Sequence, residues 1–221
     1  MSFDVLRLIG NATWDTLYMV MLSSFFGGLI GIPLGIYLAT SQRGELFASP
    51  WANTVIGAIA NALRSTPFII LAVSIIPFTR LIAGTSIGST AAIVPLTMAA
   101  FPFIARLVES AVREVDQGLV EAARAMGATP MQIVRKVLVP EALPGIILGL
   151  TLAVVSLIGY SAIVGVVGGG GLGDLGIRYG YQRFMPEVML IVVVVLIVLV
   201  QAVQSVGDIL ARRVNKRIRH S

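Results

Sequence analysis

The sequence predicts an all-α, polytopic membrane protein with about five transmembrane helices, and two observations support this fold class. The 221 residues are 57% hydrophobic and 12% charged, whereas soluble proteins carry about 25% charged residues. The apolar residues form long uncharged runs, most of them near the length of about 20 residues that a helix needs to cross a bilayer. These runs lie at 16–42, 65–79, 81–105, 142–173 and 188–207.

Composition also excludes several kinds of functional site. The chain has no cysteine, so disulfides and thiolate metal sites are excluded. Its single histidine, His220, argues against a histidine metal site or a proton relay, and we expect no metal. The first residues lack a basic region followed directly by an apolar core, so we expect no cleaved signal peptide. The net charge of +5 is better explained by basic loops beside anionic lipid than by nucleic acid.

The first two spans differ in how clearly the length of their uncharged runs indicates a membrane helix. The first contains Pro33 among several glycines. The second depends on the 15-residue run 65–79, which crosses only if Arg64 and Arg80 lie at its two boundaries. The stretch 50–63 before it is either an interfacial helix or an extension of this span. We expect the five spans at about 15–40, 56–80, 88–108, 142–165 and 187–209.

Prolines interrupt three of these spans, and two interpretations are open. Pro33 lies in the first span, Pro67 and Pro77 flank the second, and Pro95 and Pro102 lie in the third. A proline removes a backbone donor and kinks a helix, so these helices either bend around a pathway or reflect ordinary membrane-helix composition.

The distribution of lysine and arginine predicts the orientation. With the N-terminus outside, 12 of the 16 basic residues lie on the cytoplasmic side, Arg64 among them, and 4 lie outside. Because basic residues favour cytoplasmic loops, we expect the C-terminus and the segment 121–140 to be cytoplasmic.

The segment 121–140 is a charged island between two apolar spans. We expect a helix from about Gln117 or Gly118 to Met126, ended by a left-handed Gly127. A second helix then begins at Pro130 with Thr129 as its N-cap. In the first helix Leu119, Ala122, Ala123 and Met126 follow i, i+3, i+4, i+7 spacing and predict one apolar stripe, with Glu121 and Arg124 beside it.

This segment resembles the EAA loop of bacterial ABC-importer permeases. The pattern is Glu121-Ala122-Ala123, then Gly127, then Val137-Leu138-Val139-Pro140, at the family's spacing. The resemblance implies a type I ABC importer fold whose cytoplasmic coupling loop, about 110–141 of a single permease domain 1–221, docks on an ATPase. It assigns ATPase coupling to Glu121, Ala122, Ala123, Met126 and Gly127. No GxxxxGK[ST] motif occurs, so the chain is not itself an enzyme, and ATP and magnesium belong to a separate subunit.

Further stretches narrow the resemblance to permeases of D/L-methionine importers. They are RSTPFIIL (64–71), IPFTRLIAGTSIG (76–88), AAIVPLT (91–97), PFIARLVE (102–109), LIGYSA (157–162) and GGGGLGDLG (168–176). This resemblance implies a homodimer in the bacterial inner membrane with two ATPase subunits, a methionine-binding lipoprotein outside, and inhibition by cytoplasmic methionine. A permease for another small amino acid or an oligopeptide-like solute is the alternative.

Candidates for the pathway lie in two spans. Tyr160, Ser161 and Ile163 fall where the resemblance places a gate, and Asn61 and Ser65 lie near the inner end of the second span. The alternative for Tyr160 and Ser161 is packing between helices. The Gly-rich stretch 167–184 is expected outside. It is either a flexible loop that meets the delivering protein or closes the outer gate, or a tight turn.

Two other classes of protein compete with the importer. A secondary transporter would show buried ionisable residues or inverted repeats, and the runs 81–105 and 142–173 carry no charge. A scaffold protein would explain the hydropathy but not the spacing of the 121–140 motif.

Overall fold

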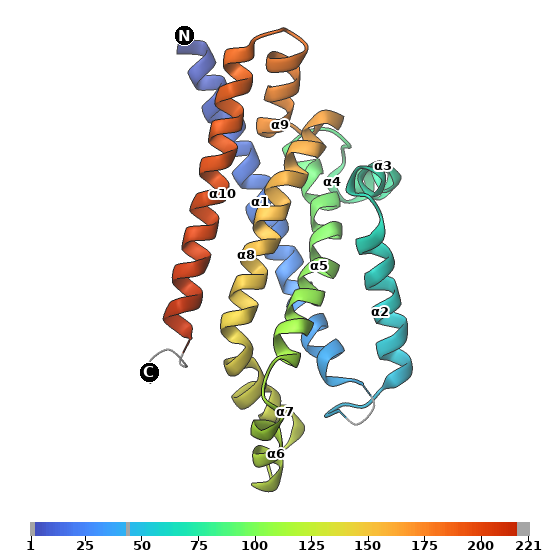
Figure 1. The fold of residues 1–221 in the computed structure, drawn as a ribbon. Coiled ribbons are helices and arrows are strands. Elements are labelled where there is room, and N and C mark those ends of the chain that lie inside the picture. Colours follow the sequence, from blue (N-terminus) through green and yellow to red (C-terminus); the bar gives the residue numbers. More distant parts are fainter. Residues whose placement is uncertain (1–2, 43–44, 216–221) are drawn as a thin grey trace.

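The computed structural model describes residues 3–42 and 45–215, which form a bundle of helices (Figure 1). Within these residues four helices are long and apolar enough to cross a membrane, or five if one bent pair counts as a span. In chain order the elements, η marking a π-helical segment, are α1 (Phe3–Thr40), α2 (Pro50–Ser65), α3 (Phe68–Ser74), α4 (Ile76–Ala83), α5 (Ser89–Arg113), α6 (Gln117–Ala125), α7 (Pro130–Ile133), η1 (Val134–Leu138), α8 (Val139–Val164), η2 (Gly165–Gly169), α9 (Gly171–Leu175), η3 (Gly176–Tyr181) and α10 (Pro186–Val214).

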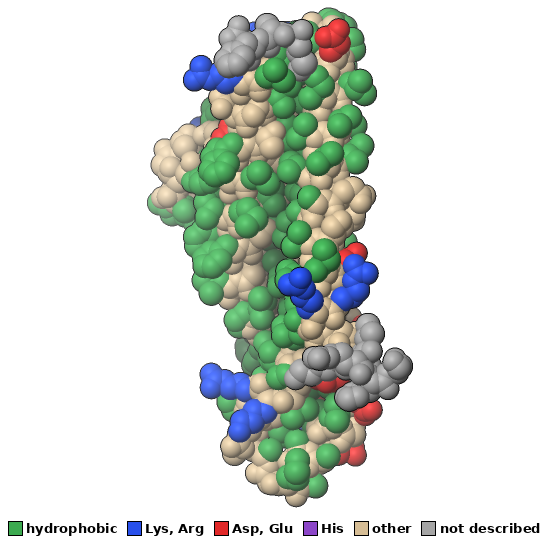
Figure 2. Space-filling view, turned by 90° about the vertical axis from the view of Figure 1, so that its left-hand side faces the viewer, with side chains coloured by type: hydrophobic (Ala, Val, Ile, Leu, Met, Phe, Trp, Pro, Cys, Tyr) green, Lys and Arg blue, Asp and Glu red, His purple; other side chains and the backbone are tan. Residues whose placement is uncertain are grey.

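The two ends of the bundle differ. Figure 1 places α6 and α7 at one end, and the start of α1 with α9 at the other. Figure 2 shows hydrophobic side chains along most of one face, whose Lys and Arg side chains lie mostly in its lower half, toward α6 and α7. An apolar flank with basic residues toward one end is the surface expected of a membrane protein.

Close contact between α1 and α5 forms the centre of the bundle, and small residues permit it. Gly27, Gly31 and Gly35 lie four residues apart on α1 and face α5. A Cβ atom added at Gly31 would lie 2.7 Å from the Phe101 carbonyl oxygen. A Cβ atom added at Gly35 would collide with the Ala105 carbonyl oxygen. Spaced small residues let membrane helices approach in this way. The glycines around Pro33 therefore serve packing, and α1 continues as one helix through Pro33.

The third span is also a single helix. Pro95 and Pro102 both lie inside α5 and are buried, and α5 continues to Arg113 without a break. Proline there does not divide the helix, in contrast to the second span.

The predicted span at 56–80 is not one continuous helix, because the chain breaks twice there. The axes of α2 and α3 differ by 103° at Thr66 and Pro67. Thr66 is extended (ψ 125°), as the residue before a proline tends to be, and Pro67 has no N–H to continue the helix. A second break at Ile75 precedes Pro77 and separates α3 from α4. The stretch before Leu63 is part of α2, which begins at Pro50.

The Gly-rich stretch 167–184 is not a loop but begins with a turn and continues as helix. Gly168, Gly170 and Gly171 take positive φ angles, and the chain then folds into α9 and η3. Leu172 is fully buried, and its backbone N–H donates to Thr16 Oγ1 of α1 at 2.9 Å. The left-handed glycines reverse the chain so that α9 packs back against the bundle.

The hydrophobic core runs without interruption from the bundle into α6 and α7. Leu96, Ile104 and Val108 of α5 belong to the same buried cluster as Val120 of α6 and Ile133 of α7. This continuity fixes the position of the charged segment relative to the membrane helices.

Candidate functional site

The helix pair α6–α7 begins and turns with well-formed local hydrogen bonds. Asp116 is the N-cap of α6, and its side chain accepts a 2.8 Å hydrogen bond from the Gly118 N–H. Gly127 ends the turn with φ 77°, as the spacing predicted. Its N–H donates to the Arg124 carbonyl at 2.9 Å, and the Ala128 N–H donates to that of Ala123 at 3.1 Å. These two bonds form a Schellman motif, which satisfies the last carbonyls of the helix.

The second helix starts as predicted at Pro130. Thr129 and Gln132 form a capping box, in which the Thr129 N–H donates to Gln132 Oε1 at 2.8 Å and the Gln132 N–H donates to Thr129 Oγ1 at 3.4 Å. Such a box satisfies two helix-end donors and fixes the entry angle. The pair is therefore a defined helix–turn–helix.

The predicted apolar stripe of α6 is divided between two faces. Val120 and Ala123 are buried, each 4% exposed, against Ile133 and the end of α5. Leu119 is 43% exposed and Met126 81% exposed, and Ala122 is also exposed. The prediction that Ala123 lies on the open stripe is therefore wrong, because the second of the two alanines packs α6 onto its own core.

The open side of the pair combines apolar and charged groups. We call it the docking face and define it as Leu119, Glu121, Ala122, Arg124, Met126 and Met131, all of which are exposed. Among the described residues, Glu121 and Arg124 form no ion pair. Exposed apolar side chains rimmed by such charges are typical of a protein contact surface.

An ion cluster around the buried Glu109 lies near the end of α5, which leads into this segment. Glu109 is 4% exposed, and its carboxylate accepts from Arg106 Nη1 at 2.5 Å and from Arg113 Nη2. Arg106 Nη2 also donates to the Gly57 carbonyl of α2 at 2.8 Å. Sequence reasoning missed this cluster, although the i, i+3 and i+4 spacing of the three residues was a signal for it.

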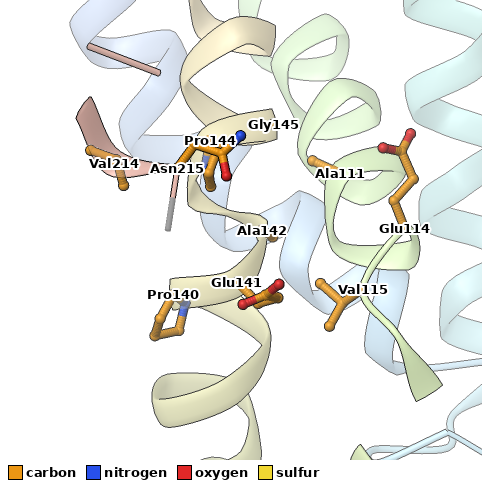
Figure 3. Close-up of a pocket in the computed structure, with 10 residues that line it drawn as sticks. All are labelled: Ala111, Glu114, Val115, Pro140, Glu141, Ala142, Pro144, Gly145, Val214 and Asn215. Atoms are coloured by element: carbon orange, nitrogen blue, oxygen red, sulfur yellow. The ribbon is translucent and has the colours of Figure 1, made fainter. Parts of the chain in front are cut away.

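A hollow of about 170 Å³ lies where α5 ends, α8 begins and α10 ends. Glu114, Val115, Glu141 and Asn215 are among its lining residues. Figure 3 shows Glu141 and Val115 on opposite sides of it.

The predicted pathway residues fall into two groups. Asn61 and Ser65 are exposed, one turn apart on α2, and Ile163 is 37% exposed on α8. The Tyr160 ring stacks on Phe68 of α3, with centroids 4.6 Å apart and planes at 13°, in line with packing between helices. Ser161 is buried, and its hydroxyl donates to the Ile158 carbonyl of its own helix at 2.7 Å. Tyr160 and Ser161 therefore do not present a pair of hydroxyls to one pathway, because adjacent helical residues point in different directions.

The sequence predicted Arg64 at a boundary of the second span, and the structure does not agree with that position. Gly57 of α2 lies at the level of Arg106, and Arg64 is seven residues, about 10 Å of helix, further along. It lines a hollow together with Ala99 and Phe103, inside the uncharged run 81–105. The signal that could have placed it was Pro67, which ends α2 at the level of the uncharged part of α5.

Comparison with known proteins relates this fold to transport. A family model described as "Binding-protein-dependent transport system inner membrane component" matches residues 31–220. The chain is 56% identical over 210 residues to the probable D-methionine transport system permease protein MetI of Vibrio cholerae, covering 95% of this chain and 93% of that protein. It is 54% identical over 165 residues to the D-methionine transport system permease protein MetI of Escherichia coli K12, covering 75% and 76%.

Solved structures agree with this relation. A chain of the MetNI methionine ABC transporter, crystallised in inward-facing conformations, is 51% identical with a TM-score of 0.95, covering 98% of this chain and 100% of that one. A chain of an amino acid ABC transporter crystallised with histidines is 22% identical with a TM-score of 0.76, covering 96% and 100%, and shares the fold alone.

Proposed function

The chain belongs to the family of binding-protein-dependent transport system inner membrane components, and on that premise we propose that it is the permease subunit of a methionine ABC importer. Two relatives that are 56% and 54% identical over the aligned residues are described as D-methionine permeases, and the matching solved structure is a methionine ABC transporter. The observation that carries the proposal is the exposed docking face on a rigid helix pair whose motif spacing matches the family.

The importer is an assembly of several chains. Two copies of this permease, each a single domain 1–221, form the membrane unit, and two ATPase subunits bind the α6–α7 ends. A binding protein delivers methionine from the other side of the membrane. The ATPase supplies ATP and magnesium chemistry, since this chain contains no GxxxxGK[ST] motif.

The docking face transmits force because both of its helices are fixed to the bundle. Leu119, Ala122 and Met126 enter a cleft of the ATPase, while Glu121 and Arg124 pair with charges at its rim. Val120 and Ala123 hold α6 against the core that continues into α5 and α8. Gly127 and the capping box keep the angle between the helices, so a shift of the ATPase moves the membrane helices rather than the loop alone.

The orientation follows from the same arrangement. The docking face lies in the cytoplasm, and the start of α1 lies outside, at the opposite end of the bundle (Figure 1). Once Arg64 is set aside as lying within the membrane, the basic residues still divide 11 to 4 in favour of this orientation. The membrane is the bacterial cytoplasmic membrane, with the C-terminus on the docking-face side.

The pathway runs along the open side of α2 and α8. Asn61 and Ser65 offer an amide and a hydroxyl on one face of α2. Ile163 is the apolar constriction, and Tyr160 supports it by stacking on Phe68. Ser161 contributes to packing, because its hydroxyl is already bonded within α8.

Co-purification tests the docking face directly. We expect Glu121→Lys to weaken retention of the ATPase by an affinity-tagged permease, because it reverses an exposed charge of the docking face. Glu187→Lys is the matched control, since Glu187 is an exposed acid in the first turn of α10, far from α6. Full retention of the ATPase by Glu121→Lys would contradict the assignment of this face.

A further inference from the structure

Arg64 is a charged residue inside the membrane part of the bundle. Arg64 is the second-to-last residue of α2, and it is exposed. Ala99, which lines the same hollow, precedes Arg106 by seven residues, about 10 Å of helix. An arginine at this level is costly against lipid, and such residues face a partner charge or a water-filled path. Among the described residues Arg64 forms neither an ion pair nor a side-chain hydrogen bond, so its exposed guanidinium is open to an anionic ligand.

The hollow beside Arg64 is lined by aromatic rings. Its volume is about 90 Å³, and Phe68, Phe103 and Tyr160 form its wall together with aliphatic side chains. Phe68 and Tyr160 are held as a stacked pair, which makes this wall a preformed surface. Phe68 is 8% exposed and belongs to the core, so the wall is not a loose surface feature.

We propose that Arg64 and this aromatic hollow form a binding station for the substrate on its way through the permease. The station takes a zwitterionic amino acid with an unbranched apolar side chain. The substrate carboxylate pairs with the Arg64 guanidinium, which suits planar, bidentate recognition. The side chain enters the hollow, where a thioether sulfur contacts the rings at their edges or faces.

The chemistry of the surroundings fits this occupant. The volume of about 90 Å³ accommodates a slender side chain and leaves the charged head group at the open side, next to Arg64. Asn61 and Ser65 are exposed on α2 at spacings of three residues and one residue from Arg64. Their oxygen atoms are acceptors for the substrate ammonium group. The inference rests on the proposed import of an amino acid and assigns the station that the import would use.

Uptake by the reconstituted importer, with its ATPase and binding protein in liposomes, is the first test. We expect Arg64→Gln to lower methionine uptake at least about tenfold, the loss of one charge-assisted pair, while ATPase retention is unchanged. Arg64→Lys keeps the charge but not the planar fork, so we expect intermediate uptake. Arg7→Gln, at an exposed arginine near the opposite end of the bundle, is the control and should transport as the unchanged chain does.

Cysteine labelling gives a readout that does not depend on transport rate. The natural chain has no cysteine, so Ser65→Cys introduces a single thiol one residue from Arg64. We expect an anionic methanethiosulfonate reagent to label it faster than a cationic one, and methionine to protect it. Arg64→Gln in the same chain should remove both the charge preference and the protection. Ile59→Cys, exposed on another face of α2, should show neither.

The outcomes separate this inference from the proposed function. If the unchanged importer takes up methionine, but Arg64→Gln transports equally well and the thiol of Ser65→Cys is never protected, the station is wrong and the importer stands. If the unchanged chain takes up no methionine with its ATPase, the proposed function itself fails. Should Arg64→Gln not assemble, labelling of Ser65→Cys in the presence of the natural arginine and of Arg64→Lys still decides, and absence of methionine protection in both would overturn the station.

Discussion

The packing of α1 on α5 allows a sharp prediction about two neighbouring glycines. An alanine at position 31 would place its Cβ 2.7 Å from the Phe101 carbonyl oxygen and 2.9 Å from Ile104 Cβ. The backbone oxygen cannot move alone, so the two helices must separate. We expect Gly31→Ala to lower the free energy of unfolding by about 1–3 kcal/mol, the usual cost of overpacking.

Gly28 is the matched control in the same part of α1. A Cβ atom there meets only Ile32 Cδ1 of its own helix, at 3.9 Å. Removing a glycine from a helix interior otherwise gains up to about 1 kcal/mol, so Gly28→Ala should be neutral or stabilising. The two identical chemical changes are therefore expected to have opposite signs.

Thermal unfolding of the purified permease in one detergent, followed by tryptophan fluorescence, measures both variants. A lower midpoint for Gly31→Ala and an equal or higher one for Gly28→Ala is the expected pair of results. Equal midpoints for the two variants would refute the claim that Gly31 is needed for close approach of α1 and α5.

Three further changes test other parts of the structure. Glu109→Gln should destabilise the chain by about 1–3 kcal/mol, since it removes the buried carboxylate that pairs with Arg106, whose side chain is 22% exposed. Arg113→Gln should cost under about 1 kcal/mol because Arg113 is 44% exposed, and denaturation of both variants compares them. Gly127→Val should weaken ATPase retention in the co-purification assay without unfolding the bundle, because φ 77° strains a β-branched residue. Gly207→Ala should lower the unfolding midpoint, since its Cβ would collide with Thr151 Oγ1 of α8.

The helix pair of the docking segment was predictable from sequence because its signals are local. Gly127, Thr129 and Pro130 determine a turn through their own backbone preferences, and the structure has that turn. The length of the hydrophobic runs likewise predicted the four long helices α1, α5, α8 and α10. The faces of α6 were not predictable, because the burial of Ala123 depends on where α5 and α7 pass.

The second span shows why periodicity and length were insufficient elsewhere. The uncharged run 65–79 with the stretch before it predicted one span. Thr66 and Pro67 divide that span into two helices whose axes differ by 103°. The break follows Arg64 directly and leaves it at the level of the uncharged part of α5, whereas charge counting had assigned Arg64 to the cytoplasmic boundary. The helices of the Gly-rich stretch were not predicted from the sequence. Their position depends on the burial of Leu172 in the core, which the local sequence does not indicate.

The most direct test of the whole account is uptake of radiolabelled methionine by liposomes that contain this chain. We predict uptake that requires the ATPase subunit, its binding protein and ATP together, and that stops when the ATPase is left out. Methionine uptake driven by an ion gradient in the absence of the ATPase would contradict the account.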